Sequence, residues 1–510
     1  MSKETGLREV DCEYPTHLQM WEEIDACNQG AKQVIKLVSD RPSAVYPDCP
    51  MMNYSHLDED GQLRAANYTY NKNLANKARR DEYWSRGRFF NAVGKTVESF
   101  HGMIHNYKAE ASFSPKMQII SEDITGSGQS IEELEKTITY QLILNGRFGG
   151  LSDMKSTDRE LTAAEQEMPE YRPKVICYEA KNIKRVISIG GTDVDIRLEE
   201  PTTIKCGDDD YSYKCVNYLR RLMLINGVYV NRLYNENDEL IEESTPRASG
   251  KVLQEIPFVF YGSDANTPAY SKPPMFDLAH INLGHFSLDC DNRDNLYYHG
   301  QGQTNVFTGM EGHEFDALNP TGLDTGAKGK NMFKAGDKVE LLQLEATGAI
   351  PAEMLRDQDR MIQAGAQVVQ PNGSAMTLGQ KKIETGSSLS TLGRISHNTS
   401  SGLEQQMEYL AMFAGAPVGD TYKVNSKFIT DDMTPELLNV HLALVQGGVL
   451  PQATLNDSAR QAGLTKLDNE QIADELMKDS ESLTGISEKE AALQAEVDAL
   501  REQLANQGDS

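Results

Sequence analysis

Two histidines, His101 and His105, lie one helical turn apart, a spacing that can place both imidazoles on one zinc ion. The run lacks the glutamate of the His-Glu-x-x-His zinc motif, and the sequence offers no evident third ligand. His280 and His285 are five residues apart, so they do not share a helix face. We expect no metal at either pair, and a neutral, hydrogen-bonded role for His280.

Two acidic runs are the other candidates for cation chemistry. Asp208, Asp209 and Asp210 are consecutive, and a second run of aspartates lies within residues 289–294. Three consecutive carboxylates in a loop cannot all face one ion, and acidic turns are common. A metal-dependent phosphodiesterase that uses the Asp208 cluster is therefore kept only as the enzymatic alternative. The second run is interpreted as the end of a long helix.

A faint phosphate-loop pattern occurs at residues 326–331, Gly-Ala-Lys-Gly-Lys-Asn. The spacing of a true phosphate loop fails, because Asp324 stands where the first glycine belongs and Asn331 stands where a hydroxyl belongs. No Gly-x-Ser-x-Gly elbow and no Cys/His nucleophile pattern is present. The sequence therefore predicts a chain that has no catalytic residue and needs no cofactor.

The composition narrows the class of protein. A chain of 510 residues can hold two to four domains, and its 50 basic against 76 acidic residues give a net charge of −26. Tight non-specific binding to duplex DNA needs clustered Lys and Arg, so this charge argues against a protein that grips DNA. The same negative charge is compatible with a protein past which DNA slides, or simply with a need for solubility. The seven cysteines form no Cys-x-x-Cys, and we expect no disulfide framework, secretory signal or membrane span.

The elements that must position any site are clearest between residues 256 and 369. A short strand at residues 256–262 precedes Pro273 and Pro274, which favour a helix start. Apolar residues at three-four spacing predict a helix from Met275 to about residue 292. Only a narrow stripe of it is polar, which suggests neighbours on most sides, as sister subunits in a ring would provide. The stripe consists of Asp277, His280, Gly284, Ser287 and Asp291.

A glycine-rich insertion follows this helix. Strand-like runs at residues 304–307 and 339–344 frame it, and a second helix is expected from Pro351 to about residue 366. The chain then breaks at residues 370–374, and a further helix is expected over residues 387–413. The sequence thus predicts two helices separated by a small β-containing insertion.

Outside this segment the sequence predicts a mixture of helices and strands. Helices are expected near residues 18–38, at 81–104 and from a cap at Ser130 to Asn145. Residues 151–153, which follow the last of these helices, look like a degraded strand. Residues 173–261 are rich in strand patterns, with a hairpin turn at Asn226-Gly227 and a polar connection at 235–254. Helices at 434–447 and 450–463 precede an acidic tail whose heptads, at 486–504, predict either a frayed helix or disorder.

Three runs carry a resemblance to a known family: Ile256-Pro-Phe-Val, Pro273-Pro-Met-Phe-Asp-Leu-Ala-His-Ile-Asn-Leu-Gly-His-Phe, and His299-Gly-Gln-Gly-Gln-Thr-Asn-Val-Phe-Thr-Gly. They are similar to segments of the portal proteins of tailed bacteriophages, which form the ring through which DNA enters and leaves the capsid. The resemblance implies an α+β subunit with an N-terminal wing (1–272), a stem helix (273–298), a clip (299–348) and a second stem helix (349–369). A tunnel loop with a long wing helix (370–433) and a C-terminal helical crown with an acidic tail (434–510) would follow.

The same resemblance implies a function and a set of partners. A portal is a non-enzymatic homo-oligomeric ring, expected to be a dodecamer, at the capsid vertex of the virion, assembled in the host cytoplasm. Its partners would be the terminase large subunit, a head–tail connector or adaptor protein, the major capsid protein and double-stranded DNA passing through the channel during packaging and ejection. The tunnel-loop candidates for DNA contact are Gln370, Asn372, Lys381 and Lys382. Another virion structural or connector protein is the alternative of the same class.

Overall fold

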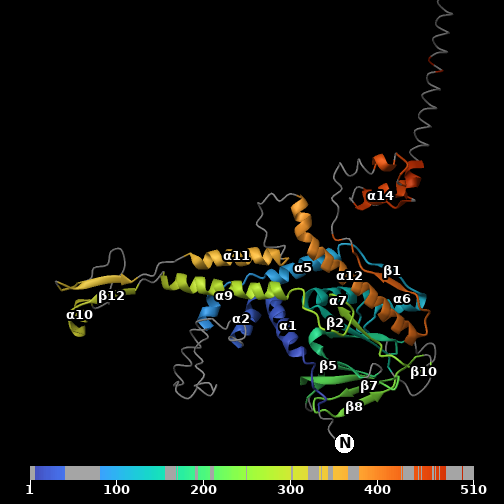
Figure 1. Cartoon of the computed structure of the whole chain (residues 1–510), viewed down its shortest axis with the longest axis horizontal. Coiled ribbons are helices and arrows are strands. Elements are labelled where there is room, and N and C mark those ends of the chain that lie inside the picture. Colours follow the sequence, from blue (N-terminus) through green and yellow to red (C-terminus); the bar gives the residue numbers. More distant parts are fainter. Residues whose placement is uncertain are drawn as a thin grey trace, which may run out of the picture. The chain divides into compact units, whose positions relative to one another are not determined.

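The computed structural model shows a mixed helix and sheet protein, α+β in class, with two compact units, residues 1–426 and 427–510 (Figure 1). The residues described are 6–40, 81–155, 168, 171–189, 193–206, 212–248, 250–299, 303–319, 332–334, 336–342, 348–365, 378–426, 428 and short pieces between 442 and 497. No described helix is long and apolar enough to cross a membrane.

The N-terminal helical stretch is two helices rather than one. Helix α1 (Tyr14–Gln29) ends at Gly30, whose φ of 95° lies in the left-handed region that favours glycine, and α2 (Ala31–Asp40) begins immediately after it. The prediction of one stretch at 18–38 is wrong in this respect, because the apolar spacing continues across a glycine that ends the first helix.

The helix expected at residues 81–104 is also interrupted. Residues 81–86 are helical, residues 87–91 are not, and α5 (Ala92–Ile104) starts after Asn91, whose side chain accepts a hydrogen bond from the Gly94 amide at 2.7 Å. The break follows from tertiary packing. A Cβ on Gly87 would lie 2.3 Å from Cys290 Sγ, so the backbone here approaches another helix too closely for a side chain.

Helix α7 (Ile131–Asn145) confirms its predicted cap and end. Ser130 and Glu133 form a capping box, and Gly146 takes a φ of 73° at the C-terminus. The next residues correct the prediction of a degraded strand, because β2 (Arg147–Asp153) is a full strand at the centre of a three-stranded sheet. Its two glycines hid the pattern. A Cβ on Gly149 would lie 2.3 Å from Phe258 Cζ, and one on Gly150 would lie 2.6 Å from Gln406 Oε1.

Two antiparallel sheets form the β-rich part of the chain. The first has the order β11-β2-β3, with β3 (Lys174–Glu179), the short 3-10 turn η2 (Ala180–Asn182) after it, and β11 (Phe258–Gly262). The second runs in sequence order: β4 (Ile183–Ile189), β5 (Asp193–Lys205), β6 (Tyr213–Ile225), β7 (Val228–Tyr234) and β8 (Leu240–Ser244). One core cluster joins the sheets, with Leu151 and Phe258 from the first and Leu198 and Leu222 from the second.

The predicted hairpin between β6 and β7 is confirmed. Asn226 and Gly227 have φ values of 51° and 76°, which a two-residue turn of this kind requires. The polar connection predicted at 235–254 instead contains β8 and the short strands β9 (Arg247–Ala248) and β10 (Lys251–Val252). Exposed edge strands need little apolar sequence, so their pattern is weak.

Helix α12 (Leu378–Ala414) is the longest element and packs on both the helices and the three-stranded sheet. It begins nine residues before the predicted start at 387.

Helix α6 (Pro115–Glu122) lies between β1 (Glu110–Ser112) and α7 in sequence, and β1 pairs with β14 (Thr421–Lys423). In the second unit, α14 (Gln452–Gln461) lies within the helix predicted at 450–463. Residues 442–445 are helical and lie within the helix predicted at 434–447. Most of the predicted heptad tail is outside the described residues.

Candidate functional site

The helix pair predicted from the sequence is present. Helix α9 (Phe276–His299) and helix α11 (Ala349–Gln363) lie side by side (Figure 1). Met361 of α11 is fully buried, and the Gln358 amide lies 3.3 Å from Nε2 of the buried His285 on α9. Gly284 faces α11 as well, and a Cβ there would make only an ordinary contact with Asp357 Oδ2 at 3.9 Å. Burial lowers the pKa of His285, so this histidine is a neutral group inside the interface.

The other faces of α9 are covered by the same chain. Phe286 is fully buried and stacks on Trp84, with 5.9 Å between the ring centroids. Asn282 donates to the Phe90 carbonyl at 2.8 Å and accepts from the Ala92 amide at 3.2 Å, which ties α9 to the start of α5. Helix α1 also packs on α9. The wide apolar face was predicted to indicate sister subunits, but these intrachain neighbours account for it, so that inference is corrected.

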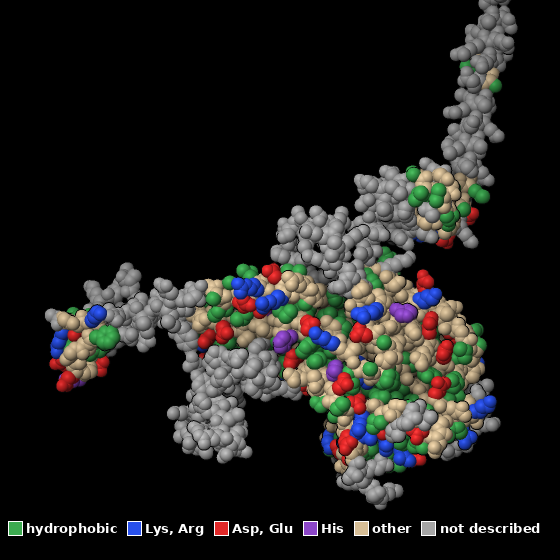
Figure 2. All heavy atoms as spheres, in the orientation of Figure 1, with side chains coloured by type: hydrophobic (Ala, Val, Ile, Leu, Met, Phe, Trp, Pro, Cys, Tyr) green, Lys and Arg blue, Asp and Glu red, His purple; other side chains and the backbone are tan. Residues whose placement is uncertain are grey.

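The pair nevertheless leaves surface exposed. Leu355 on α11 is 61% exposed and Leu296 near the end of α9 is 58% exposed. Around Leu355 the outer side of α11 carries ion pairs, with Arg356 2.7 Å from Glu353. Figure 2 shows charges of both signs over the visible face of the pair, with no extended patch of one sign. The outer surface of the helix pair therefore carries isolated apolar side chains among charged side chains that form ion pairs with one another.

The described part of the insertion between the helices contains two paired strands and one short helix. Strands β12 (Gln303–Phe307) and β13 (Lys338–Leu342) pair antiparallel, which confirms both predicted strand runs, and α10 (Gly312–Leu318) was not predicted. Asn319 accepts from the Met332 amide and donates to the Met332 carbonyl, both at 3.0 Å. Phe307 and Met332 are 58% and 62% exposed, so the insertion presents apolar side chains to its surroundings.

The four tunnel-loop candidates are placed only in part. Lys381 and Lys382 lie within α12, whereas the resemblance implied that they belong to the tunnel loop. Gln370 and Asn372 lie outside the described residues, as do Asp208, Asp209, Asp210 and residues 326–331. Contact of any of the four candidates with DNA stays a prediction.

The acidic run at the end of α9 is structural. Asp289 accepts from the Arg88 amide at 2.6 Å and from Arg293 Nε at 2.7 Å, and Asp291 accepts from the Tyr83 hydroxyl at 2.6 Å. Within the described part of the chain no group of three or more His, Cys, Asp or Glu side chains could hold a metal ion. The run lies within α9, which continues to His299, so the predicted helix end at about residue 292 is wrong.

His280 differs from its prediction as a neutral residue. Its Nδ1 lies 3.9 Å from Glu23 Oε2, and interaction with this carboxylate raises the pKa of His280. Its side chain is 66% exposed, so solvent screens the pair. The polar stripe of α9 therefore includes a histidine whose charged form is favoured.

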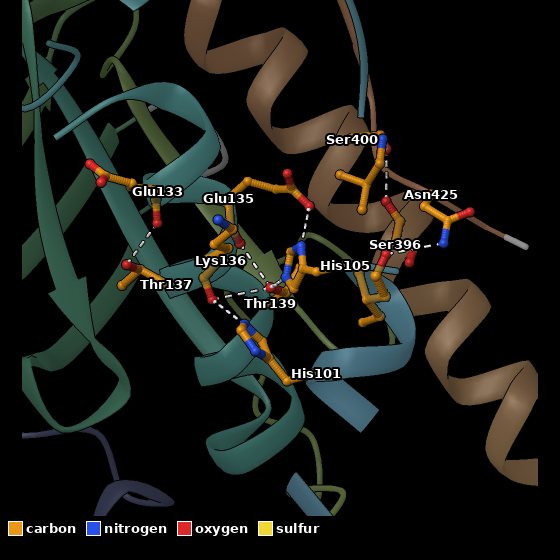
Figure 3. A network of polar contacts seen from close by, with 12 residues as sticks. His101, His105, Glu133, Glu135, Lys136, Thr137, Thr139, Ser396, Ser400 and Asn425 are labelled. Atoms are coloured by element: carbon orange, nitrogen blue, oxygen red, sulfur yellow. Dashed lines mark hydrogen bonds and ion pairs between the residues drawn. The ribbon is translucent and has the colours of Figure 1, made fainter. Parts of the chain in front are cut away.

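His101 and His105 meet a third ionisable group that the sequence did not reveal. His105 Nε2 lies 2.9 Å from Thr139 Oγ1, and its Nδ1 lies 3.3 Å from Glu135 Oε1, both on α7 (Figure 3). The order Thr–His–Glu has the connectivity of a catalytic triad. Thr139, however, is fully buried, and its hydroxyl also lies 2.9 Å from the Glu135 carbonyl within the helix, so it cannot meet a substrate. The sequence held one indication that Glu135 is buried, because it lies beside the apolar stripe of α7.

Comparison with known proteins identifies part of the chain only. Residues 274–414 match the model of a family described as a domain of unknown function, DUF4055. The match begins at the start of the helix pair and ends with α12, so it includes the insertion. No curated protein matches the chain.

Two solved structures illustrate the similarity at the level of coordinates. A chain from the virion of a native gene transfer agent particle is 12% identical, with 70% of this chain and 85% of that chain covered and a TM-score of 0.37. A chain from the neck of an empty gene transfer agent particle, computed with C6 symmetry, is 10% identical, with 75% and 92% covered and a TM-score of 0.39. These scores are too low to establish a common fold, so a function must be argued from the chain's own residues.

Proposed function

We propose that this chain is a portal-type subunit that assembles into a ring, expected to be a dodecamer, at the capsid vertex of a virion. The ring would form the channel for DNA packaging and ejection. In this proposal the chain is a non-enzymatic structural protein, and ATP hydrolysis is supplied by a separate terminase.

The observation that carries the proposal is the α9–insertion–α11–α12 segment. A helix of 24 residues is about 36 Å long at 1.5 Å per residue, enough for a channel wall. Its return through β12, β13 and α11 gives a helical hairpin with a small β-containing tip, the arrangement that a portal stem and clip need. The long α12 follows, as the wing helix of a portal would.

The faces left exposed support self-association and docking. A closed ring uses two different surfaces of each subunit, joined head to tail. Leu296 and Leu355 on the helix pair, and Phe307 and Met332 on the insertion, are exposed apolar groups that such contacts would cover. The insertion would dock the terminase large subunit and later the head–tail connector, and the wing would contact the major capsid protein. The acidic net charge would keep DNA mobile in the channel.

Two other functions would be distinguished by direct observation. A different virion connector protein would also form a ring with a channel, so it is separated from a portal by the absence of terminase binding. A metal-dependent phosphodiesterase would need the aspartates at 208–210, so changing these three residues to Ala would abolish a hydrolytic activity. For a portal, the same triple change leaves ring assembly intact and there is no activity to lose.

Electron microscopy of the purified full chain tests the proposal. Rings with a central hole are expected, and monomers that degrade DNA would overturn it. Deletion of residues 299–348, with a short linker joining the two helices, is expected to keep the rings and abolish terminase binding. The change of Phe307 to Ser, which keeps the insertion but removes one exposed apolar side chain, is expected to weaken terminase binding and leave the rings intact. Terminase binding by the deleted ring would show that the insertion is not the docking unit.

A further inference from the structure

The sequence contains three Asn-Gly pairs, and the fold places two of them in opposite surroundings. Asn226 and Gly227 form the turn between β6 and β7, and Asn226 is exposed. Asn145 and Gly146 end helix α7, and Asn145 is only 3% exposed. The third pair, at residues 372 and 373, lies outside the described residues. The two described pairs share one chemistry, so a difference in their reactivity must come from the fold.

An Asn-Gly pair can rearrange without an enzyme. The backbone nitrogen of the glycine, after losing its proton to solvent, attacks Cγ of the asparagine side chain. The N–Cγ bond forms, the bond from Cγ to Nδ2 breaks, and ammonia leaves with a proton from solvent, which gives a succinimide ring. Water then opens the ring at either carbonyl, to aspartate or isoaspartate, and no group is oxidised or reduced. Glycine favours the attack because it has no Cβ beside the nitrogen.

The turn at Asn226 leaves both reacting groups accessible. Among the described residues, no group forms a hydrogen bond with the Asn226 side-chain amide or the Gly227 backbone amide. A Cβ on Gly227 would have nothing within 4 Å, so the space beside the attacking nitrogen is open. Ring closure needs rotation of the peptide group between the two residues, which the turn holds with φ values of 51° and 76°. Only a local opening of this exposed turn is required, and such openings have a low free-energy cost.

The pair at the end of α7 is held by hydrogen bonds at both reacting groups. Asn145 Nδ2 donates to Gln141 Oε1 at 3.1 Å. The Gly146 amide donates to the Gln141 and Leu142 carbonyls at 3.2 and 3.1 Å, as the C-cap of a helix requires. The Asn145 carbonyl also accepts from Trp21 Nε1 at 3.0 Å. Ring closure here requires the helix end and its buried contacts to unfold, so this pair is an internal control.

We propose that Asn226 is a site of spontaneous deamidation in the folded chain, and that its isoaspartate product loosens the end of the β6–β7 hairpin. Isoaspartate lengthens the backbone by a methylene group in a two-residue turn that sets the register of the ladder, beginning with the pair Ile225–Val228. Either product also adds a carboxylate close to Asp193, whose Oδ1 accepts from the Asn226 backbone amide at 3.3 Å. This inference does not depend on ring assembly.

Mass spectrometry of the aged natural chain tests the site. The folded full chain, and the same chain unfolded in guanidinium chloride, are incubated at mildly alkaline pH in water enriched in the heavy oxygen isotope and then digested in ordinary water. Only deamidation during the incubation incorporates the heavy oxygen, which separates it from deamidation during digestion. Relative to the unfolded chain, Asn226 should convert at more than about a tenth of the rate and Asn145 at less than about a hundredth, because the buried pair needs a larger opening. Protection of Asn226 as strong as that of Asn145 would overturn the assignment.

Hydrogen exchange of the converted chain tests the effect on the hairpin. Amides of β6 and β7 next to the turn should exchange faster after conversion, while those of the β2–β3 ladder stay unchanged. The matched control is N226G, which keeps a residue pair suited to the turn but has no side-chain amide to lose. After the same incubation its hairpin should exchange as before. Faster exchange in the incubated N226G as well, or unchanged exchange in the converted natural chain, would show that deamidation does not loosen the hairpin.

Discussion

The helix pair and the sheets are stabilised in different ways, and the difference shows what each region can do. In the sheets, a core cluster joins the two layers, and charged groups such as Arg220 and Glu200 are paired inside, at 2.5 Å. Helix α9 is covered by other helices of the same chain, while Leu355 on α11 and Phe307 and Met332 on the insertion stay exposed. The sheets thus form a self-sufficient scaffold, and the helix pair with its insertion is the region that has surface left for partners.

The first way to break this comparison is to remove the aromatic anchor of the helix pair. Phe286 is fully buried against Trp84 and Phe89, so F286A should lower the free energy of unfolding by about 3–5 kcal/mol. Urea unfolding would measure it. The matched control V418A, at a 65% exposed position outside the proposed contacts, should change the value by less than about 0.5 kcal/mol. Equal effects at both positions would mean that α9 is not anchored as described.

A second substitution sharpens the account of the central strand. A Cβ on Gly149 would lie 2.3 Å from Phe258 Cζ, so G149A should cost about 1–3 kcal/mol of unfolding free energy through overpacking. Gly102 in α5 has nothing within 4 Å of its Cβ position, so G102A should instead stabilise the chain by roughly 0.5–1 kcal/mol. Thermal unfolding of both variants checks the sign. Stabilisation by G149A would contradict the packing of β2 against β11.

The capping box of α7 gives a smaller and local effect. Ser130 accepts from the Glu133 amide at 3.3 Å, and Glu133 Oε2 accepts from the Ser130 amide at 3.1 Å. S130A should cost about 1 kcal/mol, and hydrogen exchange should increase mainly in the first turn of α7. Uniform destabilisation of the whole first unit, without this local increase, would argue against a capping role.

The smallest expected effect is at His280. Its pKa is raised by Glu23, so the stabilisation from this pair is fully present below pH 6.5 and is lost as pH rises through the folded pKa. H280N should therefore lower the melting temperature slightly at pH 5.5 and leave it unchanged at pH 8.5. Since the side chain is mostly exposed, raising the salt concentration should reduce the difference. A larger effect at pH 8.5 would reverse the assigned sign.

Local sequence signals predicted the helix pair better than the sheet that supports it. Pro273 and Pro274, with the three-four apolar spacing, placed the start of α9 within one residue, although its end at His299 lies beyond the predicted end near residue 292, and Asn226-Gly227 placed the hairpin. These elements are determined by their own residues. Gly87 and Gly149 misled the prediction, because each glycine is required by a side chain from a distant part of the chain.

The candidate site shows the same limit. The spacing of His101 and His105 was visible in the sequence, but their partner Glu135 lies on another helix, and only tertiary packing brings the three groups together. Likewise, the sequence indicated that α9 is covered on most sides, yet it could not distinguish cover by Trp84 and α1 from cover by a second subunit. Assembly must therefore be measured.

The central claim is that the exposed faces of the helix pair and insertion serve a ring of identical subunits. Native mass spectrometry of the full chain, purified at low protein concentration without denaturant, tests it most directly. The account predicts one dominant species with about twelve times the subunit mass of 56.7 kDa. A single species at the mass of one subunit, unchanged at high protein concentration, would contradict it.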